Sequence, residues 1–194
     1  MPEGSLILPT RFCPPPAYYI EMARHGGPVV IDTAARFDKR CKQAHRCAIA
    51  DARGPLDITV PIAKPYGPTW DKVAVSLHDQ WWETTRTALE SAYGRTPYFE
   101  FYADDFLPLL HPDRFSSVSA LNRDFDAAIR RCLQLPVEVT YAQLNSPEAR
   151  EPEPVDVGPY WQVRQDRFGY LPGLSILDLL FNLGPESLLK ISRS

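Results

Sequence analysis

A cluster of basic side chains between residues 36 and 46 is the first feature of this sequence that could do chemistry. It contains Arg36, Lys39, Arg40, Lys42, His45 and Arg46. Arginine binds phosphate and carboxylate groups in bidentate geometry, so the cluster predicts a site for an anion, such as a nucleotide-linked sugar or an acyl donor. The alternative is a solvated loop whose cations balance nearby acids, and the residues alone leave both open.

A second candidate is the turn Thr10-Arg11-Phe12-Cys13, which runs into three prolines and then Tyr18. A loop between a strand and a helix can present backbone amides to an anion. Proline has no N–H, however, so this turn lacks donors that a phosphate-binding loop needs. Thr10, Arg11 and Tyr18 are therefore predicted to bind substrate through their side chains.

Nucleophilic catalysis is a third possibility, with Cys13, Cys41 or Cys47 as the nucleophile and His25, His45 or His78 as the base; Cys47 and His45 are the pair predicted to be catalytic. Neighbouring cations lower the pKa of a thiol, which favours Cys47 and Cys41 over Cys132. The alternative is a small, half-buried thiol without a catalytic role. The spacing of the four cysteines does not match a zinc site, so we expect no metal, and no cofactor is specified.

The segment Pro97 to Asp105 combines aromatic rings with carboxylates. Tyr98 and Glu100 are the candidates here, because a ring can stack on a sugar face while an acid accepts from its hydroxyls. At helical spacing, such rings more often belong to the core.

Parallel strands would bring the first candidates together. Ser5 to Thr10 and Val29 to Asp32 have the composition of buried strands, and a helix from Pro16 to His25 separates them. Such a connection usually makes the two strands parallel, and ligands bind beyond their carboxyl ends. The sequence therefore predicts a cleft shared by Arg11, Asp32 and the basic side chains Arg40 and Arg46.

The other predicted elements complete an α/β fold. A hairpin is expected over 46–50 and 55–61, a strand over 72–77, a late strand over 137–141, and helices over 80–93, 101–111, 116–135, 175–181 and from 184. Together they predict a central, mostly parallel sheet with an antiparallel hairpin and a helix-rich C-terminal half. An α+β fold is the alternative.

Composition limits the function classes. The 194 residues, 44% of them hydrophobic, predict one domain. Within it, 145–159 should be an exposed, mobile linker or loop and 160–191 a C-terminal helical clasp. The net charge of −3 without charge runs excludes a nucleic-acid groove. No apolar stretch spans a bilayer, and the opening Met-Pro-Glu-Gly lacks a signal-peptide layout. We expect a cytoplasmic protein that binds a small molecule, with its oligomeric state open.

Four blocks of the sequence resemble the WbqC-like proteins, in the form found among bacteria of the Bacteroides type. They begin at Leu8, Arg46 and Ser91 and end in a C-terminal signature that contains Phe168-Gly-Tyr-Leu-Pro and Gly184-Pro-Glu-Ser-Leu. The resemblance implies a role in O-antigen or surface-polysaccharide biosynthesis, as a glycyl or other acyl transferase acting on an amino-sugar precursor. It also makes Arg40 and Arg46 the positions that best match the family's basic element.

This sequence departs from the family pattern at two places. The basic element is only partly kept, and Thr85 stands where relatives carry a histidine. The rival hypothesis is therefore a non-catalytic binding or scaffold protein of the same fold.

Overall fold

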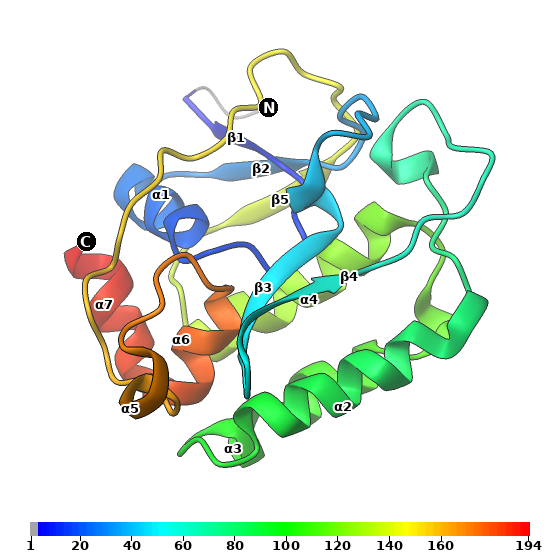
Figure 1. Cartoon of the computed structure of the whole chain (residues 1–194). Helices are drawn as coiled ribbons and strands as arrows, with labels where there is room; N and C mark the ends of the chain where they lie inside the picture. The colour runs from blue at the N-terminus through cyan, green and yellow to red at the C-terminus, as the bar shows by residue number, and fades with distance from the viewer. Residues whose placement is uncertain (1–3) are drawn as a thin grey trace.

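A three-stranded parallel sheet lies at one side of the computed structural model, which describes residues 4–194 (Figure 1). Residues 1–3, part of the opening segment considered for a signal peptide, lie outside the described residues. The strands are β1 (Leu6–Pro9), β2 (Val29–Asp32) and β5 (Val139–Ala142), in the order β1-β2-β5. Both neighbouring pairs are parallel. Their carboxyl ends therefore meet at one edge, as predicted.

Helix α1 (Ala17–His25) connects β1 to β2 and begins directly after the three prolines. Proline suits the first turn of a helix because its missing N–H would have no partner there. The helix ends at Gly26, whose φ of 63° favours glycine. On the side away from the sheet it contacts the last helix, α7 (Ser187–Arg193).

An antiparallel hairpin of β3 (Arg46–Asp51) and β4 (Gly54–Thr59) follows, as expected. The strand predicted over 72–77 is wrong. A short 3₁₀ turn covers Trp70–Lys72, and the only β-bridge that this segment makes within residues 4–194 is Ile62 with Val75. Prolines at 61 and 65 of the facing segment have no N–H to extend a ladder.

Helices make up most of the remaining chain. They are α2 (Trp81–Tyr93), α3 (Phe99–Phe106), α4 (Val118–Leu133), α5 (Gln165–Phe168) and α6 (Ile176–Leu183), with 3₁₀ turns at Lys42–Ala44, His78–Gln80, Leu107–Leu109, Pro112–Arg114 and Gly184–Glu186. The α-helix α3 ends before His111, where the sequence predicted its end, because Pro108 cannot donate an i to i−4 hydrogen bond. The predicted α/β class is confirmed.

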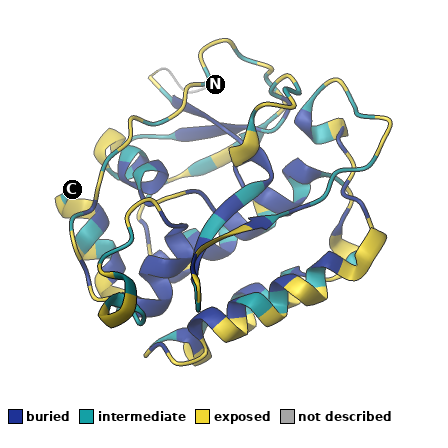
Figure 2. Cartoon of the chain, viewed as in Figure 1, coloured by how far each residue is buried: buried dark blue, intermediate teal, exposed yellow. Residues whose placement is uncertain are grey.

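Helix α6 occupies the centre of the packed layers. It contacts β3, α2, α3 and α4, and Figure 2 shows it almost entirely buried. Phe181 contacts the rings of Tyr93, Phe99 and Phe106 at centroid distances of 5.1 to 5.8 Å. The backbone N–H of Ile176 also donates to the carbonyl of Pro14 at 2.9 Å, which fastens the proline-rich turn to this helix.

No helix or strand is present between Ala142 and Gln165. This segment passes beside α1 on its way to α5 (Figure 1). Arg150 forms an ion pair with Glu21 of α1, and its backbone N–H donates to Ile7 of the edge strand β1. The segment therefore contacts the sheet and α1 along its path, and its mobility stays a prediction.

Candidate functional site

A cavity of about 540 Å³ opens beside the proline-rich turn, within the size range of small-molecule sites. Its walls come from the turn after β1, from the segment 151–157 and from the segment before α6. They consist mainly of proline, valine and tyrosine side chains, with few polar groups. The lining residues are Arg11, Pro14, Pro15, Pro16, Ala17, Tyr18, Gln43, Glu151, Pro152, Pro154, Val155, Asp156, Val157, Tyr160, Tyr170, Pro172, Gly173 and Leu174.

Among residues 4–194, Arg11 supplies the only cationic side chain that lines this cavity. Its side chain is 6% exposed. Nη1 donates to the carbonyl oxygen of Thr10 at 2.7 Å, and Nε donates to Glu151 at 3.1 Å, with which Arg11 forms an ion pair. Burial lowers the pKa of Arg11, yet a guanidinium stays charged at neutral pH. The cavity therefore holds a fixed positive charge.

A second cavity of about 430 Å³ lies next to the first. Arg11 and Glu151 line both cavities. Arg36 of the basic cluster, Cys41 and Trp70 line the second one only. The Arg11–Glu151 pair thus forms part of the wall between the two spaces.

Asp32 holds the start of the loop that carries Glu151. Its side chain is fully buried, and its carboxylate accepts four backbone N–H groups at 2.8 to 3.2 Å, from Ala34, Leu144, Asn145 and Ser146. A carboxylate occupied in this way has little capacity left for a ligand. The structure therefore gives Asp32 a positioning role, and the substrate contact that the sequence predicted for it stays a prediction.

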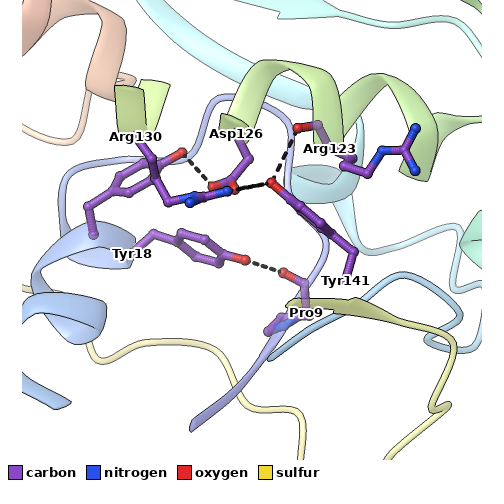
Figure 3. A network of polar contacts seen from close by, with 7 residues as sticks. Pro9, Tyr18, Arg123, Asp126, Arg130 and Tyr141 are labelled. Atoms are coloured by element: carbon purple, nitrogen blue, oxygen red, sulfur yellow. Dashed lines mark hydrogen bonds and ion pairs between the residues drawn. The ribbon is translucent and has the colours of Figure 1, made fainter. Parts of the chain in front are cut away.

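A polar network around Asp126 lies behind the cavity wall (Figure 3). Tyr141 donates to the Asp126 carboxylate at 2.6 Å, Arg130 at 2.8 Å and Tyr19 at 3.2 Å. Burial and the charge of Asp126 raise the pKa of Tyr141. The network is satisfied internally, so it anchors α4 to α1 and β5.

Two substrate candidates, Thr10 and Tyr18, lie beside this network, and Tyr18 also lines the larger cavity. Tyr18 donates to the carbonyl of Pro9 at 2.8 Å, and the hydroxyl of Thr10 accepts from Asn122 at 3.1 Å. Together with Arg11 and Asp126 they border an internal space of about 10 Å³. That volume holds at most about one water molecule, which places any substrate on the outer side of Tyr18.

Tyr160, another residue of the wall, is held by a buried carboxylate behind it, Asp178. The hydroxyl of Tyr160 donates to Asp178 at 2.6 Å, and the side-chain amide of Gln162 donates to the same oxygen at 2.9 Å. Burial raises the pKa of Asp178. This side of the cavity therefore depends on a buried acid whose charge needs these donors.

We expect Tyr160→Phe to lower the free energy of unfolding by about 1.5 to 3 kcal/mol, because a buried carboxylate loses a donor. Tyr170→Phe is the matched control, since its hydroxyl bonds Asp156 at the surface. The pKa of Asp178 is already raised, so protonation as the pH falls through its folded value favours the folded state. Urea titrations should show that the loss of unfolding free energy in Tyr160→Phe becomes smaller at acid pH. Equal losses in Tyr160→Phe and Tyr170→Phe would contradict the role given to the Tyr160–Asp178 hydrogen bond.

The proposed catalytic pair, His45 and Cys47, lines neither of the two cavities. Nδ1 of His45 lies 2.9 Å from the carbonyl oxygen of Val60, so this nitrogen donates, and burial lowers the pKa of the ring. His45 stacks on Trp70, at 5.9 Å between centroids. Cys47 is buried in the core beside Cys13, whose pKa is raised by burial and by a hydrogen bond with Cys47.

The expected cleft of Arg11, Asp32, Arg40 and Arg46 is not assembled. Arg40 is exposed and bonds Asp38, and Lys39 lies over the ring of Tyr66. Arg46 lies on β3, where its Nε is buried without a hydrogen-bond partner. Neither Arg40 nor Arg46 lines a cavity with Arg11. Their roles as ligands stay predictions.

Tyr98 and Glu100 lie at the start of α3. The backbone N–H of Tyr98 donates to Phe181 at 3.2 Å, its ring packs over Gly184, and Glu100 is exposed. Neither residue lines the two cavities. Sequence reasoning missed Glu151, Tyr160 and Tyr170, and the alternation of glutamate and proline at 151–154 was the one local signal.

Two classes of site find no support in residues 4–194. No group of three or more histidine, cysteine or acidic side chains there is placed to hold a metal ion. Over the same range, every helix is too short or too polar to cross a membrane.

The fold and the cavity define an α/β protein with a ligand-sized cavity near the carboxyl edge of a parallel sheet. A family model described as the WbqC-like protein family matches residues 10–153. The chain therefore belongs to the WbqC-like protein family, as the sequence blocks indicated. Searches of curated proteins and of solved structures found no match. The matched range includes Arg11 and Glu151 but stops before Tyr160.

Proposed function

We propose that this protein is a Bacteroides-type family member that transfers a glycyl or other acyl group to an amino-sugar precursor of a surface polysaccharide or O-antigen. The larger cavity is the proposed substrate site. The observation that carries the proposal is the buried guanidinium of Arg11 in a cavity walled mainly by proline, valine and tyrosine side chains. Such a wall suits a flat sugar or base, while the cation binds a phosphate or carboxylate.

The lining residues favour direct attack of the amine on the acyl donor. Among residues 4–194, no histidine, cysteine or lysine lines the larger cavity, so no thiol, imidazole or amine there could carry the acyl group. Asp156 and Glu151 are the carboxylates that could accept the amine proton and return it to the donor's leaving group, whose bond to the acyl carbon breaks as the amide bond forms. Arg11 could stabilise the oxyanion that forms, with Thr10 and Tyr18 fixing its position.

A non-catalytic binding protein is the second candidate. The observation that favours it is that the proposed catalytic residues His45 and Cys47 are buried and do not line the cavity. Both candidates require a ligand at Arg11. They differ in whether a transferred acyl group can be detected on the acceptor by mass spectrometry.

A thermal-shift screen against nucleotides, nucleotide-sugars, glycine and coenzyme A tests the shared requirement. A ligand at a hundred times its Kd stabilises the folded state by about 2.7 kcal/mol. We expect Arg11→Gln to weaken binding at least about ten-fold, since a charge-assisted hydrogen bond contributes about 1.5 to 3 kcal/mol. The control is Arg95→Gln at an exposed position. Equal affinity of Arg11→Gln and the wild type would refute the site.

A further inference from the structure

The counter-ion of Arg11 is unlike that of Arg130, a half-buried arginine in α4. Arg130 pairs with Asp126 one helical turn away, and both side chains are largely buried, at 17% and 6% exposure. Arg11 is 6% exposed, but its partner Glu151 is 53% exposed and comes from a segment without helix or strand. A buried cation needs an anion, and here a half-exposed loop carboxylate supplies it.

The position of this pair coincides with the site. Arg11 and Glu151 both line the two neighbouring cavities, so the paired side chains separate them. Moving the Glu151 side chain away would expose the guanidinium to both spaces. The backbone of the loop need not leave, because its start is held by Asp32 and Val157 further along is buried.

From this placement we infer that the Glu151 carboxylate occupies the position of the ligand's own anionic group, and that a ligand binds by displacing it from Arg11. The ligand class is an anion with a carboxylate or phosphoryl head on a flat, weakly polar body. The head takes the N–H groups that Glu151 now holds, and the body lies against the proline and tyrosine wall. This inference rests on the proposed use of the larger cavity as a substrate site.

Competition between Glu151 and a ligand anion for Arg11 would lower the measured affinity for the anion. If Glu151 occupies Arg11 nine-tenths of the time, the apparent affinity for an anion falls about ten-fold. Glu151→Gln removes the competing charge and keeps the shape of the side chain. Glu153→Gln is the matched control, because Glu153 is exposed in the same loop and forms no ion pair within residues 4–194.

Titrations followed by NMR with benzoate and with phenyl phosphate test the inference and distinguish the two head groups. Glu151→Gln should bind one or both about ten-fold more tightly than the wild type, with Glu153→Gln unchanged and neutral benzyl alcohol unaffected. Unchanged or weaker binding by Glu151→Gln would overturn the inference, since Glu151 would then be a bystander or a ligand contact.

A second measurement needs no ligand. The rate at which phenylglyoxal modifies Arg11, read by peptide mass spectrometry, should rise about ten-fold in Glu151→Gln and stay constant in Glu153→Gln. An unchanged rate would also count against displacement. If nucleotide-sugars bind, but Glu151→Gln changes neither the affinity for the anions nor the rate of Arg11 modification, the displacement of Glu151 is refuted and the proposed function is not. If Glu151→Gln binds only the simple anions more tightly and no nucleotide-sugar binds, the displacement of Glu151 is supported and the proposed amino-sugar substrate is refuted.

Discussion

Asp32→Asn is expected to lower the free energy of unfolding by roughly 3 to 5 kcal/mol. The substitution removes the charge and places an amide NH₂ against backbone donors, and each hydrogen bond to a charged group contributes about 1.5 to 3 kcal/mol. Oδ1 of Asp32 accepts from Ala34, Leu144 and Asn145, and Oδ2 accepts from Ser146. The loss would be a large share of the roughly 5 to 15 kcal/mol that stabilises most proteins.

Asp38→Asn is the matched control. Asp38 also accepts a backbone N–H, from Arg40 at 2.8 Å, but at the exposed surface. Urea unfolding should place this variant near the wild type. Hydrogen exchange in Asp32→Asn should increase at residues 144–146. If Asp32→Asn unfolds with nearly the wild-type free energy and the amides of residues 144–146 stay protected, other contacts hold the loop.

Phe181→Ala should cost about 3 to 5 kcal/mol, the usual loss for a buried phenylalanine. Its side chain is fully buried and contacts aromatic rings of α2 and α3. This variant tests the proposal that residues 160–191 form a clasp that folds with the rest of the chain.

Phe101→Ala is the corresponding change at a ring that is 76% exposed on α3. Its effect should stay within about 0.5 kcal/mol, as for most surface substitutions. Calorimetry should show a single transition shifted strongly in Phe181→Ala alone. Two separate transitions in the wild type, only one of them sensitive to Phe181, would instead indicate that the C-terminal segment unfolds independently.

Local patterns predicted most of the fold. The apolar stripe of α4, the proline-initiated α1 and the β-branched run Val29–Ile31 each carry their signal within a few residues. The segment 72–77 has the same kind of alternation, with Val73 and Val75 buried. Its alternation reflects burial alone. A β-ladder also requires backbone N–H donors on the facing segment, and the hydrophobic period of one segment gives no information about the donors of another.

The site was harder to predict because its parts are remote in sequence. Arg11 was identified by its place after the first strand, which the chain order sets. Its partner Glu151 lies 140 positions away in an irregular loop, and no period predicts the path of such a loop. The basic cluster was conspicuous in composition, yet Arg40 reaches solvent and Arg46 lies on β3, since composition does not tell which way a side chain points.

The strand order also has a consequence for synthesis on the ribosome. The central strand β2 is complete at Asp32, but its second neighbour β5 begins only at Val139. At a synthesis rate of about 5 to 20 residues per second, one edge of β2 stays unpaired for several seconds until β5 has been made. Unpaired strand edges invite association with other chains, so we expect the nascent chain to be more prone to association during that interval than a chain whose strands pair in sequence order.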